Sequence, residues 1–308
     1  MSEISPMGYF DPKNAKQIVE ESQEDLLNYL QEIVGFSELK SYLYTLTGMS
    51  KFRELRESYG LKGGGVSVPD VYVLIGSGDK KEASRHLSKH YKKMKMIKSS
   101  GIYRANLNDY IYAYVSNARD ALDKLFDKAK SATLVIAGFE ELVKNPRPPI
   151  SDWHDWDDVL CNFVSELILK NASETCTMLS ITQKTYDHLL KCYPKLRKLN
   201  RKTILCPRYS ADEMAKKLEQ KIKEDGYDIE EDALHELSLI FQQVANHEVR
   251  VKDSNAISSL FNKILDRQKQ RLSKVPLKHL SGYHFKSIKS VDIPSLSIPV
   301  DRDNVIYL

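Results

Sequence analysis

The chain contains 308 residues, of which 42% are hydrophobic and 29% are charged, proportions that are ordinary for a soluble globular protein. Because 46 basic residues nearly balance 42 acidic ones, the net charge of +4 points to no particular class of partner. No uninterrupted apolar run approaches the roughly 18 residues that cross a bilayer, and the N-terminal residues have no apolar core of the kind found in signal peptides. We therefore expect a cytoplasmic protein with no membrane partner.

The four cysteines are widely spaced along the chain. Cys161, Cys176, Cys192 and Cys206 lie 14 to 16 residues apart, which suits neither a close-spaced zinc site nor a small disulfide scaffold. We expect reduced, structural cysteines, in keeping with a cytosolic setting, and no metal site.

The N-terminal part of the chain begins with helices and then reaches a strand. Apolar side chains recur at helical spacing over residues 15–58. Gly35 interrupts this pattern, and Ser37 is a suitable N-cap for the helix that follows it. Three consecutive glycines in 62–69 predict a flexible loop. The short run 71–76, rich in β-branched residues, predicts a buried strand.

Helices and strands alternate in the middle of the chain. Helices are predicted near 117–130 and 156–171, and further buried strands at 133–139, 177–182 and 203–207. Strands of five to seven residues that alternate with helices are typical of a parallel, doubly wound sheet. The predicted fold class is therefore α/β, with a helical stretch after the sheet.

This pattern divides the chain into four predicted segments. They are an N-terminal helical extension over 1–30, an α/β core over 31–208, a helical lid over 209–272 and an extended C-terminal tail over 273–308. Prolines punctuate the tail, which we expect to pack on the body or to reach a partner.

Four motifs follow one another along the chain: IVGFSELK (33–40), VYVLIGSG (71–78), PKLRKLNRKTILCPRYSADEM (194–214) and NKILDRQKQRL (262–272). Their order and spacing resemble those of the AAA+ ATPase group that includes the rubisco activase CbbX and stage V sporulation protein K. The likeness covers roughly residues 30–272. It implies a P-loop-type core with a nucleotide site after the first strand and a C-terminal helical lid.

The nucleotide loop that the resemblance implies is degenerate. A working P-loop reads GxxxxGK[ST]: backbone N–H groups cradle phosphates, the lysine reaches the terminal phosphates and the hydroxyl holds Mg²⁺. Here the matching loop is one residue short, and Asp79 replaces the glycine before the lysine. Its carboxylate would repel phosphates, so we expect no cofactor, with ATP or ADP as the alternative. The candidate nucleotide-binding residues are Gly76, Ser77, Gly78, Lys80 and Lys81.

The catalytic positions that the resemblance implies are also replaced. The family carries Asp-Glu at the end of the next strand, where this chain has Ala137 and Gly138, which neither coordinate metal nor act as a base. Glu140 and Glu141 follow, and the start of a helix or loop explains them more simply than a relocated catalytic pair. No arginine lies in 253–259, where a lid arginine is expected. Without these groups, no residue is left to stabilise the charge of the transferred phosphoryl group or to activate the attacking water. We expect no catalytic residues.

Two further positions of the family have possible substitutes in this chain. Thr182 or Gln183 stands where the family has the polar residue of its sensor strand. Arg197 and Arg201 flank the position of the arginine finger, which the family supplies to the neighbouring subunit of a ring. A shift in register would make either arginine a contact to a neighbouring subunit.

Two pairs of aromatic residues are candidate partner contacts. Tyr114, with Tyr112 beside it, takes the place of the family's pore-loop tyrosine, although a strand with tyrosines on one face explains them equally well. Trp153 and Trp156 are candidate docking anchors. They lie in an acidic run that suits a helix N-terminus better than a metal site.

Residues 80–98 form a basic stretch, with seven lysines and one arginine against a single glutamate. A basic helix of this kind can bind nucleic acid in a salt-dependent manner. A solvated helix face is the simpler interpretation.

We therefore expect a pseudo-ATPase: a catalytically degenerate AAA+-like protein that acts as a structural or regulatory subunit or adaptor. Its partner would be a protein, either an AAA+ paralogue or further copies of itself in a ring. One alternative is a divergent AAA+ motor that is active in a mixed ring. The other is a nucleic-acid-binding module that uses the helix at 80–98.

Overall fold

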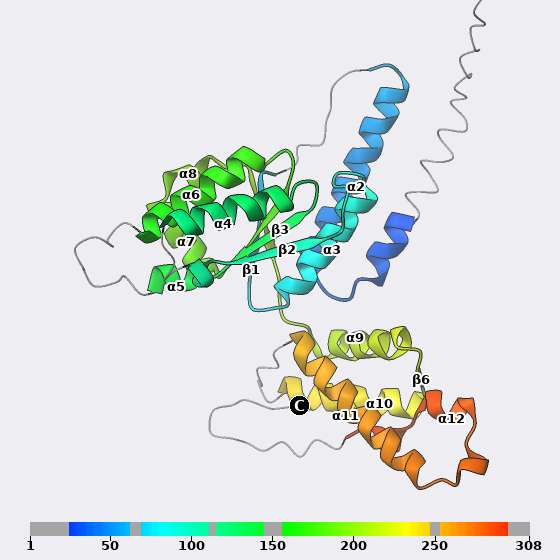
Figure 1. Ribbon diagram of the computed structural model, residues 1–308. Helices are drawn as coiled ribbons and strands as arrows, with labels where there is room; N and C mark the ends of the chain where they lie inside the picture. Colours follow the sequence, from blue (N-terminus) through cyan, green and yellow to red (C-terminus); the bar gives the residue numbers. More distant parts are fainter. Residues whose placement is uncertain (1–24, 62–68, 111–114, 145–155, 247–252, 295–308) are drawn as a thin grey trace, which may run out of the picture. The chain divides into compact units, whose positions relative to one another are not determined.

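The computed structural model describes residues 25–61, 69–110, 115–144, 156–246 and 253–294. The chain divides into two compact units between Cys206 and Pro207. The first unit contains a five-stranded sheet with helices, and the second is mainly helical (Figure 1). No helix in the described ranges is long and apolar enough to span a membrane.

The sheet of the first unit is parallel, with strand order β2-β3-β4-β1-β5. The interior strand β1 pairs with β4 and β5, so that Tyr72 lies opposite Met178 on one side and Lys202 on the other. This arrangement confirms the predicted α/β fold class. The strands are β1 (Val71–Ile75), β2 (Ile102–Asn106), β3 (Thr133–Ala137), β4 (Cys176–Ser180) and β5 (Arg201–Leu205).

Helices cover both faces of this sheet (Figure 1), because right-handed crossovers that run in opposite directions along a sheet lie on opposite faces. On one face lie α2 (Ser37–Ser58) and α3 (Lys80–Lys93). On the other lie α4 (Val115–Lys128), α6 (Trp156–Asn171), α7 (Gln183–Cys192) and α8 (Pro194–Lys198). The short helices η1 (Leu107–Tyr110) and α5 (Phe139–Lys144) follow the carboxyl ends of β2 and β3.

Alternating side chains of β1 pack on the two faces of the sheet, because successive side chains of a strand point to opposite sides. Val71 and Val73 belong to the apolar cluster formed with α4, α6, α7 and α8. Tyr72 points to the other face, where its ring contacts Tyr42 of α2 and Tyr91 of α3 edge-on. The Tyr42 and Tyr72 hydroxyls lie 2.8 Å apart.

His90 is buried between α2 and α3. Its Nε2 lies 3.1 Å from the Thr47 hydroxyl, which itself donates to the Leu43 carbonyl. Thr47 can therefore accept from His90, which favours the neutral tautomer with the proton on Nε2. Burial, assisted by the charge of Lys93, lowers the pKa of His90 to about 4 from the ordinary 6.5.

Acidification is therefore expected to destabilise the first unit through His90. Because the folded pKa lies below the unfolded value, this contribution is complete above about pH 6.5 and is lost as the pH falls toward 4. At about 1.4 kcal/mol per pH unit, the loss by pH 4 is about 3 kcal/mol. Urea unfolding at pH 7 and pH 4 measures it, with His90→Gln as the reference that cannot titrate. Identical pH dependence in the two proteins would contradict a buried neutral histidine.

Within its described residues, the second unit contains three long helices and a small parallel sheet of two strands, β6 and β7. A capping box begins its first helix, since Ser210 accepts from the Glu213 N–H and the Glu213 carboxylate accepts from the Ser210 N–H. These helices confirm the predicted helical C-terminal stretch. The segment boundaries predicted from the sequence stay predictions. The elements of this unit are α9 (Ala211–Glu224), β6 (Asp228–Ile229), α10 (Glu231–Asn246), α11 (Asp253–Ser273), η2 (Leu277–His279), α12 (Gly282–Lys286), β7 (Ser287–Ile288) and η3 (Ser290–Asp292).

Candidate nucleotide-binding site

The candidate site lies at the carboxyl edge of the sheet, where loop 76–79 joins β1 to α3. The strand that follows β1 in the chain, β2, lies at one edge of the sheet, and the last strand, β5, lies on the other side of β1. In open α/β sheets, ligands bind outside the carboxyl ends of the strands where the strand order reverses. The loop after β1 is thus the position at which a nucleotide would be sought.

The end of β5 closes over this loop. Cys206 donates its N–H to the Ile75 carbonyl at 2.7 Å, and its own carbonyl accepts from the Gly78 N–H at 2.9 Å. Gly76 has φ of 102°, and a Cβ at this position would lie 2.4 Å from the Cys206 carbonyl oxygen. Gly76 therefore permits the contact between the two strand ends, in addition to the left-handed turn.

Asp79 is the N-cap of α3. Its carboxylate accepts from the Glu82 N–H at 2.9 Å, and the side chain is buried. A bound phosphate would use the same helix terminus, because the free N–H groups and the dipole both favour an anion there. In this protein the carboxylate of Asp79 is the anion at the N-terminus of α3.

Lys80 extends across the edge of the sheet to the end of β4. Its Nζ donates to the Ile181 carbonyl at 2.8 Å. Burial lowers the pKa of Lys80, while the negative charge of Glu140 opposes this shift. Glu140 is itself engaged, since its carboxylate accepts from the Thr182 N–H at 2.8 Å. The remaining candidates Ser77 and Lys81 are exposed.

A side chain would not fit at Gly138, the residue that follows β3. Gly138 has φ of 91°, and a Cβ there would lie 2.3 Å from the Asn106 Oδ1 and 2.9 Å from the Leu107 nitrogen. The turn after β2 thus occupies the space that a side chain would need. Among the described residues, no group of three or more histidines, cysteines, aspartates or glutamates is placed to hold a metal ion.

The residues at the expected sensor position make local contacts. Thr182 is the N-cap of α7, where its Oγ1 accepts from the Thr185 N–H. The Gln183 side-chain amide donates to the Asp187 carboxylate at 2.7 Å within the same helix. Both side chains therefore stabilise α7.

Both arginines near the expected finger position bind carbonyls at helix ends. Arg197 donates to the Leu190 and Lys191 carbonyls in the last turn of α7. Arg201 donates to the Arg197 carbonyl at 3.0 Å. Cations at helix C-termini satisfy orphan carbonyls and complement the helix dipole. The two side chains are exposed, which leaves them accessible to a partner. Their contact with a neighbouring subunit stays a prediction.

Three of the four aromatic candidates, Tyr112, Tyr114 and Trp153, lie outside the described residues. Trp156 is the first residue of α6, but its side chain is not among those described.

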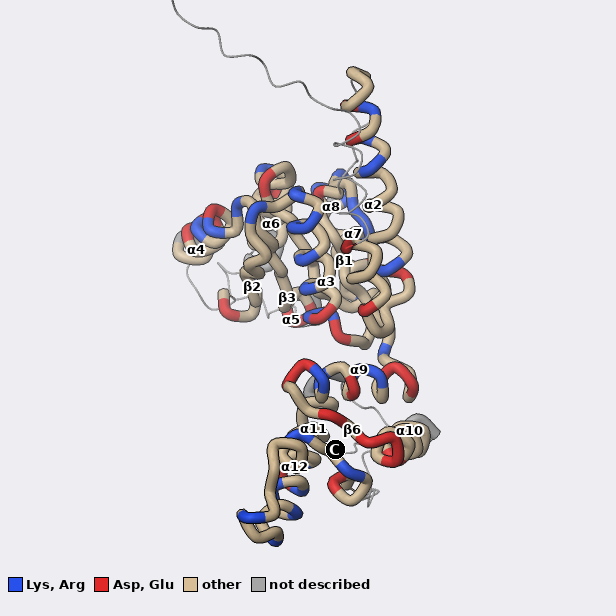
Figure 2. Tube along the Cα trace, turned by 90° about the vertical axis from the view of Figure 1, so that its right-hand side faces the viewer, with Lys and Arg blue, Asp and Glu red and all other residues tan. Residues whose placement is uncertain are grey.

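The basic face of α3 is partly covered by the helical residues 25–32. The Nζ atoms of Lys89 and Lys93 lie 4.2 and 4.9 Å from the ring centre of Tyr29. The Tyr29 hydroxyl lies 2.8 Å from Nδ1 of His86, also in α3. Basic and acidic residues are interspersed along the chain elsewhere (Figure 2), as expected from the nearly balanced composition.

No protein-family model matches the chain, and no curated protein matches it. The five-stranded parallel sheet is consistent with an AAA+ core but is not specific to it. The AAA+ assignment therefore remains a resemblance.

Sequence reasoning missed how the candidate loop is closed. Asp79 and Glu82 have the spacing of a helix capping signal, which would have predicted the N-cap at this position. The contacts from Lys80 and Gly78 go to backbone carbonyls of Ile181 and Cys206. Every residue has such a carbonyl, so no sequence signal could have identified these partners.

Proposed function

We propose that the protein is a non-hydrolysing, AAA+-like pseudo-ATPase that acts as a structural or regulatory subunit or adaptor through protein contacts. The observation that carries this proposal is the closure of the loop after β1 by the chain's own groups. The Gly78 N–H, the Glu82 N–H and the Lys80 ammonium, all of a kind that would bind phosphate, have intramolecular acceptors.

Nucleotide binding would have to compete with these contacts. A phosphate at the start of α3 would meet the buried carboxylate of Asp79 and would need it to leave the helix terminus. Reaching the phosphate with Lys80 would free the buried Ile181 carbonyl, and leaving such an acceptor unsatisfied costs about 1–3 kcal/mol. The closed loop thus supports a structural turn in place of a nucleotide site.

The two other functions expected from the sequence receive less support. A motor in a mixed ring would need a catalytic base and a magnesium ligand from a neighbour, because Ala137 and Gly138 supply neither. A nucleic-acid contact on α3 would have Lys89 and Lys93 partly engaged over Tyr29. Protein contacts, with an AAA+ paralogue or with further copies of the chain, remain the proposed activity.

A phosphate-release assay with Mg·ATP tests the loss of hydrolysis. The purified protein should release phosphate no faster than a blank without protein, and Lys80→Ala combined with Lys81→Ala should leave this rate unchanged. Magnesium-dependent turnover that disappears in the double variant would contradict the proposal, since it would require a working loop.

A further inference from the structure

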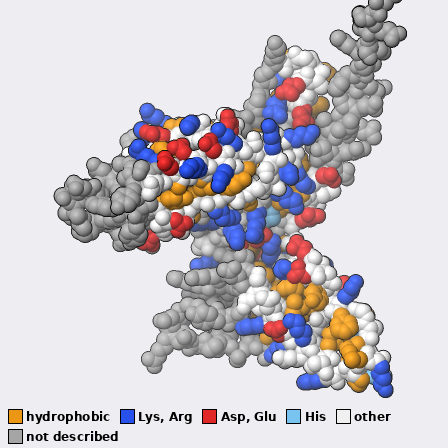
Figure 3. All heavy atoms as spheres, viewed as in Figure 1, with side chains coloured by type: hydrophobic (Ala, Val, Ile, Leu, Met, Phe, Trp, Pro, Cys, Tyr) orange, Lys and Arg blue, Asp and Glu red, His pale blue; other side chains and the backbone are white. Residues whose placement is uncertain are grey.

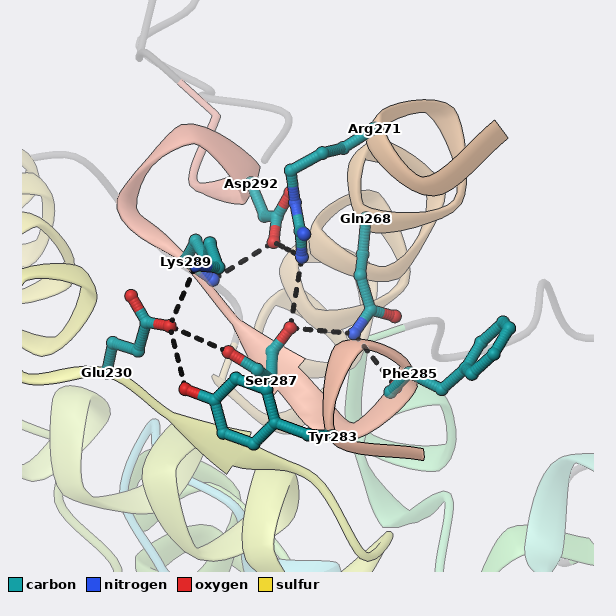
Figure 4. Close-up of polar contacts among 8 residues, drawn as sticks. All are labelled: Glu230, Gln268, Arg271, Tyr283, Phe285, Ser287, Lys289 and Asp292. Atoms are coloured by element: carbon teal, nitrogen blue, oxygen red, sulfur yellow. Dashed lines mark hydrogen bonds and ion pairs between the residues drawn. The ribbon is translucent and has the colours of Figure 1, made fainter. Parts of the chain in front are cut away.

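The exposed apolar side chains of the second unit do not form one surface. The ion pair of Arg271 and Asp292 anchors the C-terminal segment 277–292 to α11 (Figure 4). Within this segment, Tyr283 and Phe285 lie on opposite sides of α12 (Figure 4). The first unit differs in this respect, because several exposed apolar side chains share one face of its helix α2.

Helix α2 has apolar side chains on two opposite faces, whereas a helix at a protein surface normally has one apolar face. The inner face carries the buried residues Leu39, Leu43 and Leu46. No residue of α2 after Ser50 is buried, and the last turns of the helix extend past the sheet (Figures 1 and 2). The outer face is thus open to contact along the whole of this extension.

The apolar residues of the outer face follow helical spacing. Tyr44, Gly48, Phe52, Leu55 and Tyr59 are separated by four, four, three and four positions, so they lie in one stripe along the helix and its C-cap. Tyr44 is 41% exposed, Phe52 59% and Tyr59 79%, and Leu55 is partly exposed. We call these five residues the α2 stripe. Contiguous exposed apolar side chains mark sites of interaction.

The glycine of the stripe is not explained by contacts within one chain. Glycine weakens a helix interior relative to alanine. A Cβ at Gly48 would meet no atom within 4 Å, so no described part of the chain requires a glycine there. Tyr44 and Phe52 lie one turn away on either side and leave a gap between them. A gap of this kind accepts a side chain from a second helix, as a hole accepts a knob in helix packing.

The outer four residues of the stripe are placed symmetrically along α2. Tyr44 and Tyr59 are equally distant from the midpoint of the stripe, which lies next to Phe52, and so are Gly48 and Leu55. An antiparallel second copy, with its two-fold axis at this midpoint, places the partner subunit's Leu55 opposite Gly48. It also places the partner subunit's Tyr59 opposite Tyr44. The stripe is therefore complementary to itself, with a large side chain facing each gap.

The charges beside the stripe also suit a second copy. Lys51 and Glu54 lie along one edge of it. In an antiparallel pair this edge meets the same edge of the other copy, which brings Lys51 near the partner subunit's Glu54 on both sides of the axis. The part of α2 visible in Figure 3 shows basic and acidic side chains together. A nucleic acid or an anionic bilayer would meet the carboxylate of Glu54, which is unfavourable.

We propose that the α2 stripe is the interface of a homodimer, in which α2 of each copy packs antiparallel on α2 of the other. The two copies of Phe52 meet at the two-fold axis, and Leu55 of each copy enters the gap at Gly48 of the other. Two-fold symmetry closes this contact, so it gives a dimer and not a filament. The dimer goes beyond the proposed function, because it depends neither on the AAA+ resemblance nor on the closed loop after β1.

Sedimentation velocity of the full chain between about 1 and 100 µM tests this proposal. We expect a dissociation constant of about 10 µM, because one helix from each copy makes a small interface. Phe52→Ser should raise this constant about tenfold or more, since two buried phenyl rings are lost. Leu169→Ser is the matched control: Leu169 of α6 is 42% exposed, and its replacement should leave the dissociation constant unchanged.

Two further changes separate the interface from the fold. Gly48→Gln should raise the dissociation constant about tenfold by filling the gap. Glutamine favours the helix, so the melting temperature of the monomer should not fall. Lys51→Glu should also raise the constant about tenfold, because two attractive contacts become repulsive. Lys51→Glu combined with Glu54→Lys should restore it to within about threefold, since both pairs are attractive again.

Three results would overturn the proposal. The first is a full chain that stays monomeric at about 100 µM. The second is a dimer that Phe52→Ser leaves intact or that the exchange of Lys51 and Glu54 does not restore. The third is a dimer that forms only after residues 1–24 are removed, because those residues would then be the occupant of the α2 stripe in the full chain.

Discussion

Replacing Gly76 by alanine should destabilise the first unit by about 4 kcal/mol. A residue with a side chain at a φ of 102° is strained by about 1–3 kcal/mol. The new Cβ would also lie 2.4 Å from the Cys206 carbonyl oxygen, a backbone atom that cannot move without shifting the end of β5. The hydrogen bond from Gly78 to that carbonyl would be lost as well, at a cost of about 1 kcal/mol.

Gly60→Ala provides the control for this prediction. Gly60 also has a positive φ, 72°, but a Cβ added there would meet no atom within 4 Å, so the substitution should cost only about 1–2 kcal/mol. Urea unfolding followed by tryptophan fluorescence reports on the first unit, to which both tryptophans belong. Equal destabilisation by the two substitutions would contradict the close approach of β5 to the loop.

The second large effect is expected for Asp292→Ala, which should destabilise the second unit by about 4 kcal/mol. The Asp292 side chain is 1% exposed and the Arg271 side chain 20%. Removing one partner of such a pair leaves the other charge buried and uncompensated. The substitution also removes the acceptor for the Lys289 N–H, which lies 3.0 Å from the carboxylate.

The exposed pair of Asp266 and Lys269 serves as the control for this variant. Both side chains are more than half exposed, at 67% and 73%, so Asp266→Ala should cost no more than about 0.5 kcal/mol. Thermal unfolding followed by helical circular dichroism compares the two variants. Similar losses for Asp292→Ala and Asp266→Ala would show that the buried pair does not anchor the C-terminal segment.

The interior strands β1, β3 and β4 could be predicted from the sequence, whereas the edge strand β2 could not. In β1, β3 and β4, four of five residues are buried, which produces the continuous apolar runs on which the prediction depended. In β2 only Ala105 is buried, so this strand carries no such run. An edge strand in contact with solvent need not be apolar, and β2 lies at one edge of the sheet. The other edge strand, β5, was predicted because its end carries the apolar run Ile204, Leu205 and Cys206.

The replaced residues of the candidate site could be predicted from the sequence, but the contacts that close the loop could not. The sequence alone indicates that Asp79 stands where the P-loop has glycine and that Gly138 stands where a carboxylate is expected. It gives no sign that the Cys206 carbonyl meets the Gly78 N–H or that Lys80 reaches Ile181, since these contacts join strand ends far apart in the chain. The proposed loss of nucleotide binding depends on this tertiary arrangement.

The central claim is that the loop after β1 is closed and holds no nucleotide. Titration calorimetry of the full chain with ATP and with ADP, in the presence and absence of Mg²⁺, tests this claim most directly. We predict no saturable binding tighter than about 1 mM under any of these conditions. Saturable binding of either nucleotide at micromolar concentrations, lost when Lys80 is replaced by alanine, would contradict the claim.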